Sequence, residues 1–218
     1  MSLLHDIGDY IQVNHGVIGT ALLQHLRLSL IPVLVAVVLA VPVGWIATIH
    51  VALRHTLFTA GNILYTVPSL AMFLVLPGLL GTSILDETNV IVALAIYTLA
   101  LLVPRVAEGL NSVDPLVLQA ATAMGYKPVR RWATVQLPLA LPVVFAAVRV
   151  ATVANVSLVT VASLIGIGGL GGLFTRGFQL GFYAPPIVIG LVLCVGLAIV
   201  LDLLIVALQR LVTPWVRA

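Results

Sequence analysis

The sequence predicts an all-α integral membrane protein with about five transmembrane helices. Of its 218 residues, 61% are apolar and only 8% are charged, whereas an ordinary soluble domain has roughly 25% charged residues. The apolar residues gather in five charge-poor runs. Their lengths are close to the ~20 residues that a spanning helix needs. These runs lack the alternation of barrel strands and exceed their length of ~10 residues. The composition therefore argues against a soluble enzyme, a disordered protein and a nucleic-acid-binding protein.

The candidate spans divide the chain into one main domain and two short ends. They cover residues 28–49, 59–80, 89–104, 139–165 and 187–208. The first three contain no charged residue, and Pro68 predicts a kink in the second. Residues 1–20 contain two aspartates but no Lys or Arg, so we expect a polar leader at the membrane surface and not a signal peptide. Residues 21–212 form a single transmembrane domain, and 213–218 form a C-terminal tail.

The basic residues set the expected orientation. With the N-terminus outside and the C-terminus in the cytoplasm, seven fall in cytoplasmic segments: Arg54, Arg105, Lys127, Arg130, Arg131, Arg210 and Arg217. Only Arg176 falls in an outer loop, and the opposite orientation would reverse this count. Because positive residues concentrate on the cytoplasmic side of membrane proteins, the first orientation is favoured. The longest cytoplasmic segment is then the loop 105–138.

This loop has the local signals of a helical hairpin. Asp114 followed by Pro115 predicts a helix start, because the carboxylate can cap the first turn and proline suits the first helical position. A short helix is expected over 116–124, with Gly125 as its C-terminal cap. A second short helix is expected over 129–136. The loop therefore predicts two short helices joined by a glycine turn.

The same loop resembles the cytoplasmic loop of ABC-importer permeases. That pattern is Glu-Ala-Ala, three residues, Gly, nine residues, Ile, one residue and Leu-Pro. The matching residues here are Gln119, Ala120, Ala121, Gly125, Val135, Leu137 and Pro138. The spacing agrees throughout, with Gln119 in place of the acid and Val135 in place of Ile. The small side chains of Ala120 and Ala121 are expected to leave one helix face open to another protein surface.

Three further segments resemble one branch of these permeases, the osmoprotectant importers. They are Tyr65–Phe73, Gly109–Pro115 and the glycine-rich Leu164–Gly171. With the loop, they extend the resemblance over about residues 20–210. The branch transports glycine betaine, choline, carnitine and proline betaine. Methionine importers have a similar length and five spans, but their second span is less similar to this one, so they remain the alternative for the cargo.

The resemblance implies the type I ABC-importer permease fold and a mechanism. Two permease subunits, identical or different, form the pathway, and an external binding protein delivers the cargo. Two cytoplasmic ATPases bind ATP and Mg²⁺, and each holds the region 119–127, including Lys127, as a coupling helix. This chain has no P-loop, so we expect neither an enzyme nor a bound cofactor here. The expected location is the lipid bilayer of a prokaryotic plasma (inner) membrane, crossed several times.

Seven side chains in the spans are candidates for lining the pathway. They are Tyr65, Ser69, Tyr97, Arg149, Asn155, Ser157 and Thr160. The tyrosine rings could contact a quaternary ammonium by cation–π interaction, although an aromatic cage belongs more naturally to the binding protein. Hydroxyl groups in helices also often bond back to helix carbonyls. Arg149 either pairs inside the protein or lines the inner half of the pathway, and Asp202 is expected to pair with a basic residue.

The remaining patterns bear on rival functions. The glycine-rich segment follows a span and not a strand, so it predicts a turn or gate facing the binding protein and not a dinucleotide loop. Gly168 and Gly172 could allow close helix packing. The five histidines form no metal-ligand pattern, and no intramembrane catalytic cluster is evident. An ion-coupled transporter needs acidic residues in mid-membrane, whereas Glu108 and Asp202 lie toward the inner ends of their spans.

Overall fold

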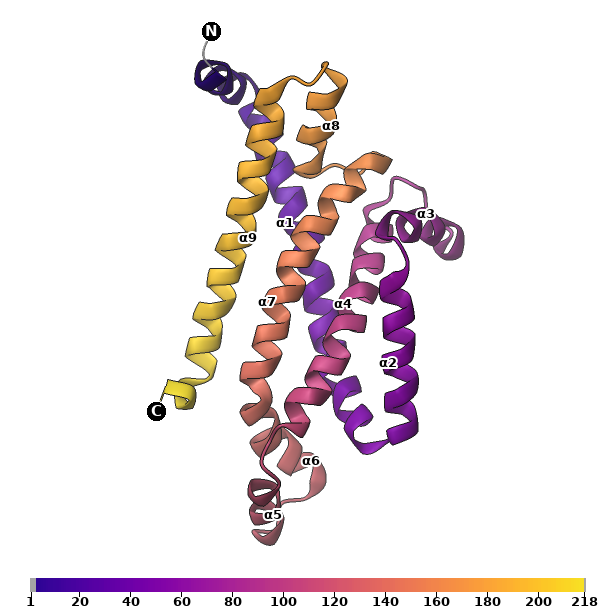
Figure 1. The fold of residues 1–218 in the computed structure, drawn as a ribbon, viewed down its shortest axis with the longest axis vertical. Coiled ribbons are helices and arrows are strands. Elements are labelled where there is room, and N and C mark those ends of the chain that lie inside the picture. The colour runs from indigo at the N-terminus through magenta and orange to yellow at the C-terminus, as the bar shows by residue number, and fades with distance from the viewer. Residues whose placement is uncertain (1–2, 218) are drawn as a thin grey trace.

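The computed structural model describes residues 3–217, and within that range it consists of helices and short connections, with no strand (Figure 1). The helices are α1 (Leu3–Ile49), α2 (Val51–Thr66), α3 (Ser69–Leu80), α4 (Glu87–Asn111), α5 (Pro115–Ala123), α6 (Pro128–Arg131), α7 (Leu137–Ala162), α8 (Gly171–Gln179) and α9 (Ala184–Val212). A π-helical turn covers Trp132–Gln136, and 3₁₀ turns cover Ser163–Ile165 and Pro214–Arg217. Residues 1, 2 and 218, which belong to the expected leader and tail, lie outside the described residues.

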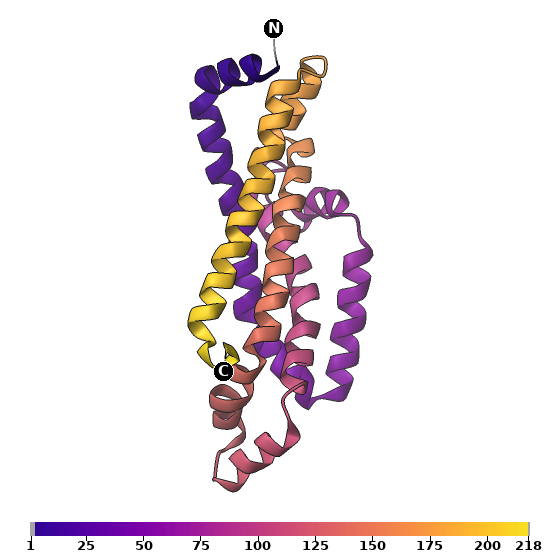
Figure 2. The ribbon, with the colours of Figure 1, turned by 60° about the vertical axis from the view of Figure 1, so that its left-hand side comes forward.

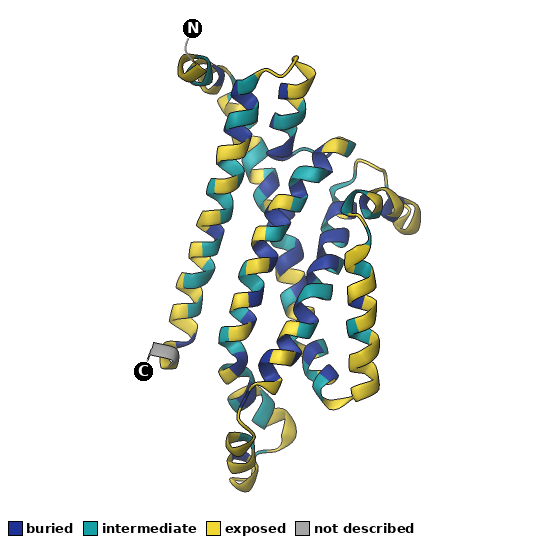
Figure 3. Ribbon diagram, in the orientation of Figure 1, coloured by how far each residue is buried: buried dark blue, intermediate teal, exposed yellow. Residues whose placement is uncertain are grey.

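Four helical stretches of the described chain are long and apolar enough to cross a membrane. They are α1, α4, the continuous stretch Pro128–Ile165 and α9. They contain four of the five predicted spans. The outward side of α9 remains largely exposed along its length (Figure 3), and its exposed residues are mainly Leu, Val and Ile. A face of this composition suits the hydrocarbon of a bilayer.

The remaining predicted span, residues 59–80, is broken in two. α2 and α3 meet at Pro68 and differ in direction by 107°, so α3 lies across the bundle beside the far end of α2 (Figure 1). Proline disfavours a helical conformation in the residue before it, and Val67 has an extended backbone here. The hydroxyl of Tyr97 donates a 2.6 Å hydrogen bond to the Val67 carbonyl at the break. The predicted kink is thus confirmed, and the bend separates two helices.

The first helix changes direction near its start. Asn14 has non-helical backbone angles (φ −113°, ψ 15°), and its side-chain amide donates a 3.0 Å hydrogen bond to the Tyr10 carbonyl. Figure 2 shows the preceding turns lying across the top of the bundle, while the rest of α1 runs along it. The direction therefore changes at Asn14, inside the segment 1–20 that is predicted to be a surface leader.

The centre of the bundle is packed through small side chains. The buried alanines of this core are Ala36, Ala40, Ala140, Ala147 and Ala151, which come from α1 and α7 and meet larger residues of α4. Small residues let helix backbones approach closely in membranes, where apolar burial alone does not favour helix association over lipid contact. A consequence is that polar side chains between helices matter for their alignment.

The two ends of the bundle differ in what they carry. One end, called the inner end below, holds α5, α6, the turn between α1 and α2, and the C-terminus (Figure 1). The opposite end, called the outer end, holds the start of α1 and α8. Lys127, Arg130 and Arg131 belong to the inner end, and Arg176 belongs to the outer end. The clustered basic residues and Arg176 therefore lie at opposite ends of the bundle, and the side of the membrane that each end faces stays a prediction.

Candidate functional site

A helical hairpin at the inner end is formed by α5, a glycine turn and the start of the helix that continues into α7. α5 begins as predicted, because Oδ1 of Asp114 accepts a 2.8 Å hydrogen bond from the backbone N–H of Leu116, and Pro115 is the first helical residue. The carboxylate satisfies a donor that the first helical turn cannot pair internally. The cap therefore fixes where this helix starts.

Gly125 ends α5, as predicted. Its φ is +84°, its N–H donates to the Thr122 carbonyl at 2.9 Å, and the N–H of Tyr126 donates to the Ala121 carbonyl at 3.1 Å. This pair of bonds is a Schellman cap, whose left-handed position favours glycine. Nη1 of Arg131 also donates to Oγ1 of Thr122 at 2.7 Å. The backbone bonds therefore close the turn, and the side-chain bond joins the two arms of the hairpin.

The second arm is not the separate short helix that the sequence suggested. α6, the π-helical turn and α7 continue without interruption from Pro128 to Ala162. Pro138 has no N–H to donate, and directly before it the N–H of Leu137 reaches back five residues to the Trp132 carbonyl. The π-helical turn thus lets the helix continue through the proline. Leu137 and Pro138 lie within one long helix and do not mark its start.

The base of the hairpin is anchored to the bundle. Gln136 is buried, and its Nε2 donates a 3.0 Å hydrogen bond to the Leu110 carbonyl near the end of α4. The ring of Trp132 stacks on that of Trp45 from α1, with centroids 4.7 Å apart. These contacts therefore link the hairpin to both α1 and α4.

The hairpin extends beyond the bundle (Figure 1). It exposes apolar side chains there. Leu116, Met124 and Val129 are each more than 60% exposed. Of the predicted coupling residues, Gln119, Ala120 and Lys127 are exposed. Ala121 is only 1% exposed, so the expectation that it lies open to another surface is wrong: its side chain faces the interior of the hairpin. Exposed apolar side chains grouped in this way are typical of a protein interaction surface.

The two predicted pathway tyrosines lie together but differ in exposure. Their rings form an edge-to-face pair with centroids 5.9 Å apart. Tyr97 is buried and its hydroxyl is used at the α2–α3 break, whereas Tyr65 is 48% exposed. Ser69, the first residue of α3, is partly buried. Of these three residues, Tyr65 presents the most open side chain.

Arg149 forms an ion pair with Asp202. Pairing inside the protein was one of the two predictions for Arg149. Nε and Nη2 of Arg149 bind Oδ1 and Oδ2 of Asp202 at 2.7 and 2.8 Å, which joins α7 to α9. The side chains remain 39% and 27% exposed. Two parallel bonds of this type hold a guanidinium and a carboxylate in a fixed relative geometry.

The other polar candidates on α7 have different surroundings. Asn155 is buried, and its Nδ2 donates to Oγ1 of Thr98 at 3.0 Å and lies 3.5 Å from the Ser29 carbonyl oxygen. It therefore connects α1, α4 and α7. Oγ1 of Thr160 bonds back to the Ser157 carbonyl at 2.6 Å, while Ser157 itself is exposed.

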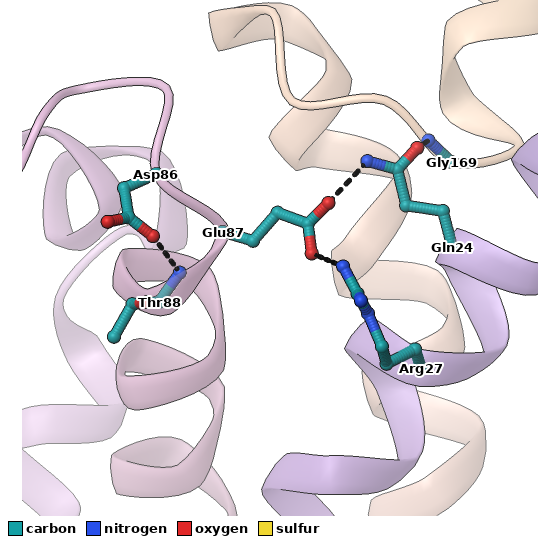
Figure 4. Close-up of polar contacts among 6 residues, drawn as sticks. All are labelled: Gln24, Arg27, Asp86, Glu87, Thr88 and Gly169. Carbon is teal, nitrogen blue, oxygen red and sulfur yellow. Dashed lines mark hydrogen bonds and ion pairs between the residues drawn. The ribbon is translucent and has the colours of Figure 1, made fainter.

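A polar network at the outer end was not predicted from the sequence (Figure 4). Gln24 of α1 accepts a 2.7 Å hydrogen bond from the backbone N–H of Gly169 and donates one of 2.8 Å to Glu87 at the start of α4. Glu87 is also ion-paired with Arg27. Beside it, Asp86 caps α4, and the hydrogen bonds from Thr88 lower the pKa of its carboxyl group. The network joins two helices to the glycine-rich segment.

His25, next to Gln24, holds the same segment from inside the bundle. Its Nδ1 accepts a 3.2 Å hydrogen bond from the N–H of Leu170, so Nε2 carries the proton that is donated to the Val156 carbonyl at 2.9 Å. One indication of this role is present in the sequence alone, which is that Gln24 and His25 are polar residues within an apolar stretch. The residues that they bind in this segment and in α7, namely Gly169, Leu170 and Val156, are more than 100 residues away along the chain.

The glycine-rich segment does not pack helices in the way that was expected. Gly168 lies in the connection before α8 and faces the Gln24 side chain, and nothing lies within 4 Å of a Cβ built at Gly172. The close approach occurs at Gly171 instead, where a Cβ would come within 2.5 Å of the Thr160 carbonyl oxygen. The expectation for Gly168 and Gly172 is therefore wrong, and the neighbouring glycine takes that role.

Comparison with known proteins agrees with this architecture. Residues 22–218 match the model of a family described as the binding-protein-dependent transport system inner membrane component. The chain is 34% identical to a choline transport system permease protein of Bacillus subtilis (strain 168), over 97% of this chain and 95% of the relative. It is also 34% identical to an osmoprotectant import permease protein of Salmonella typhimurium, over 94% of this chain and 96% of the relative.

Solved structures share the fold at lower identity. An inward-facing form of the MetNI methionine ABC transporter superimposes with a TM-score of 0.81 at 22% identity, covering 90% of this chain and 96% of the other. An amino acid ABC transporter gives a TM-score of 0.75 at 18% identity, covering 98% and 99%. The family match, the full-length relatives and this fold agree. The chain belongs to the binding-protein-dependent transport system inner membrane component family and is a multi-pass permease subunit of an ABC importer.

Proposed function

We propose that this permease forms the translocation pathway for small osmoprotectants that carry a quaternary ammonium group: glycine betaine, choline, carnitine and proline betaine. Several full-length relatives from Bacillus, Listeria and Salmonella are named for choline, carnitine, glycine betaine or osmoprotectant transport, which supports this cargo class. An external binding protein delivers the cargo. A second permease subunit, identical or different, completes the pathway.

The observation that carries the energy-coupling part of the proposal is the anchored hairpin at the inner end. Two partner ATPases, which bind ATP and Mg²⁺, each hold one hairpin through its exposed apolar face and the residues Gln119, Ala120 and Lys127. Gly125 shapes the turn, and Leu137 and Pro138 belong to the helix that carries motion into the bundle. A rigid short element that is joined to spanning helices suits the transfer of a rigid-body movement.

A methionine or other amino-acid cargo is the main alternative, and the solved structures with this fold include transporters of that kind. Their identity to this chain is below 25%, so they bear on the fold and not on the cargo. Ion-coupled transport is the weaker alternative, because Asp202 is held in a two-bond ion pair with Arg149 and the family is that of binding-protein-dependent importers.

The test is uptake by the complete importer, purified through a tag on this chain and reconstituted with its binding protein. We expect an ATPase to co-purify with the chain, and labelled glycine betaine or choline to enter the vesicles only when ATP is supplied. Inactivating the ATPase alone should abolish uptake. Entry of methionine but of neither quaternary ammonium compound would overturn the cargo class, and uptake driven by an ion gradient without ATP would overturn the energy source.

A further inference from the structure

A groove of about 350 Å³ runs between α2 and α4 and contains both polar and aromatic side chains. α2 contributes Phe58, Asn62 and Tyr65, and α4 contributes Arg105 and Glu108. Its volume lies within the roughly 300–1,000 Å³ that is typical of small-molecule sites. The groove lies in the part of α4 nearer the inner end and is separate from both the hairpin and the outer network.

The other side of α2 provides an internal comparison. A second groove there, of about 310 Å³, is lined by apolar side chains of α1, α2 and α4. Gly61 and Ala100 border both grooves, and a Cβ at Gly61 would come within 3.3 Å of the Ala100 carbonyl oxygen. The close contact of α2 with α4 therefore separates an apolar side, suited to lipid, from a polar side. A charged pair facing hydrocarbon is costly, so the polar side faces water or protein.

The polar groove offers complementary groups for both ends of a zwitterion. Nη1 of Arg105 binds Oε2 of Glu108 at 2.8 Å, and both side chains remain about half exposed, so each charge can take a further partner. The half-exposed ring of Tyr65 is braced edge-to-face by Tyr97. The exposed amide of Asn62 lies one helical turn from Tyr65 on the same helix.

We propose that this groove is a cargo-binding site within the permease for a zwitterion with a quaternary ammonium group and a carboxylate. The ammonium group lies against the Tyr65 ring, where cation–π attraction applies, and near the carboxylate of Glu108. The cargo carboxylate is bound by Arg105 and by the amide of Asn62. This inference rests on the proposed function, from which it takes the cargo class.

The internal ion pair sets the strength of binding. In the empty groove Arg105 and Glu108 satisfy each other, so cargo must compete with an existing salt bridge. Cargo therefore binds here more weakly than it would bind to a guanidinium and a carboxylate that were not paired with each other. A weak site suits a pathway, because cargo that bound tightly here would not be released on the inner side.

Selective uptake tests the carboxylate contact. Choline has the ammonium group but no carboxylate, so we measure glycine betaine and choline uptake side by side with saturating cargo-loaded binding protein. Arg105→Gln should lower glycine betaine uptake about tenfold and choline uptake much less, since a lost hydrogen bond to a charged group has effects of this size. Arg105→Lys should restore most of the betaine uptake. An equal loss for both cargoes, with reduced ATPase stimulation, would assign Arg105 to coupling and overturn the proposal.

The aromatic contact has its own matched pair. Tyr65→Leu should lower the uptake of both cargoes about fivefold, as expected for a lost cation–π contact, while Tyr65→Phe should remain near wild type. The carboxylate of Glu108 is tested by Glu108→Gln. Its control is Asp9→Asn, which removes the carboxylate of an exposed His5–Asp9 pair far from the groove. Only Glu108→Gln should reduce uptake. Equal uptake by the Leu and Phe variants would exclude the ring from cargo binding.

Cysteine protection separates failure of the site from failure of the proposed function. Cys194 is the only cysteine, so Asn62→Cys can be labelled specifically in a Cys194→Ser background. Millimolar glycine betaine should slow the labelling of Asn62→Cys several-fold and leave that of Thr59→Cys, an exposed position one turn away, unchanged. Uptake without protection would overturn the groove as the site. If the wild-type importer transports neither glycine betaine nor choline, the proposed function fails instead.

Discussion

Asn155, Gln136 and His25 are buried polar side chains that each connect separate parts of the fold. The amide of Asn155 binds Thr98 on α4, Gln136 binds the Leu110 carbonyl, and His25 binds the glycine-rich segment and α7. Where helices contact each other through alanine and valine, they can shift along one another with little change in packing. Hydrogen bonds between particular residues form in only one alignment, so the buried polar side chains fix how the helices align.

Replacing Asn155 with alanine should therefore destabilise the bundle by about 1 kcal/mol, the usual range for an interhelical hydrogen bond in a membrane protein. Thermal unfolding of the purified protein in detergent measures this loss. Ser157→Ala on the exposed side of the same helix serves as the control and should leave the transition unchanged. Equal stability of the two variants would show that the Asn155 amide does not contribute to alignment.

Gly125 controls the shape of the hairpin through its positive φ. Gly125→Arg should leave membrane insertion intact but separate ATP hydrolysis from uptake, because an L-residue at φ +84° strains the turn and shifts the face offered to the ATPase. The measurement is the ratio of ATP hydrolysed to cargo transported in reconstituted vesicles. Gly125→Asn should be affected less, because asparagine tolerates the left-handed region better than other L-residues. Normal coupling in the Arg variant would contradict the assignment of this turn.

Among the helical elements, features that depend on neighbouring residues were predicted correctly from the sequence. Features that depend on contacts between distant residues were not. The start and end of α5 follow from Asp114, Pro115 and Gly125, because a cap involves only neighbouring residues. The continuity of the second arm through Pro138 depends on a π-helical turn whose base packs on α1 and α4, which the sequence of the loop alone does not reveal. The Gln24–Glu87 bond joins residues 63 positions apart, and composition carries no signal for such a pairing.

The Arg149–Asp202 pair joins α7 to α9. Arg149→Leu should loosen α9 and lower the unfolding temperature, because it leaves the Asp202 carboxylate without its guanidinium inside the membrane. The double change Arg149→Leu with Asp202→Leu should be less harmful than the single one, since no unpaired charge remains. Both variants are compared by thermal unfolding in detergent. A double variant less stable than the single one would show that the pair is not the main link.

For the whole molecule, the asymmetry between the two ends predicts how it lies in the membrane. The basic hairpin and the C-terminus occupy one end, and α8 and the capped start of α4 are nearer the other (Figure 1). Both the distribution of charge and the number of spans were predictable from the sequence. The 107° break between α2 and α3 was predictable only as a kink, because its size depends on what the two helices pack against.

Labelling of single cysteines tests this orientation in intact cells. In a Cys194→Ser background, Leu85→Cys in the exposed connection before α4 should react with a membrane-impermeant thiol reagent added outside. Arg130→Cys in the hairpin should react only after the membrane is permeabilised. The opposite pattern would reverse the topology and remove the hairpin from the reach of any cytoplasmic ATPase.

The helix that contains the π-helical turn has a mechanical consequence. The stretch Pro128–Ile165 comprises 38 residues, or about 57 Å at 1.5 Å per residue, and so exceeds the ~30 Å hydrocarbon core of a bilayer. It carries the hairpin at one tip and leads directly into the glycine-rich segment at the other. A rod of this kind works as a lever: a tilt imposed on its cytoplasmic tip displaces its far tip at the same moment. We expect such a lever to let the two faces of the membrane open and close in opposite phase.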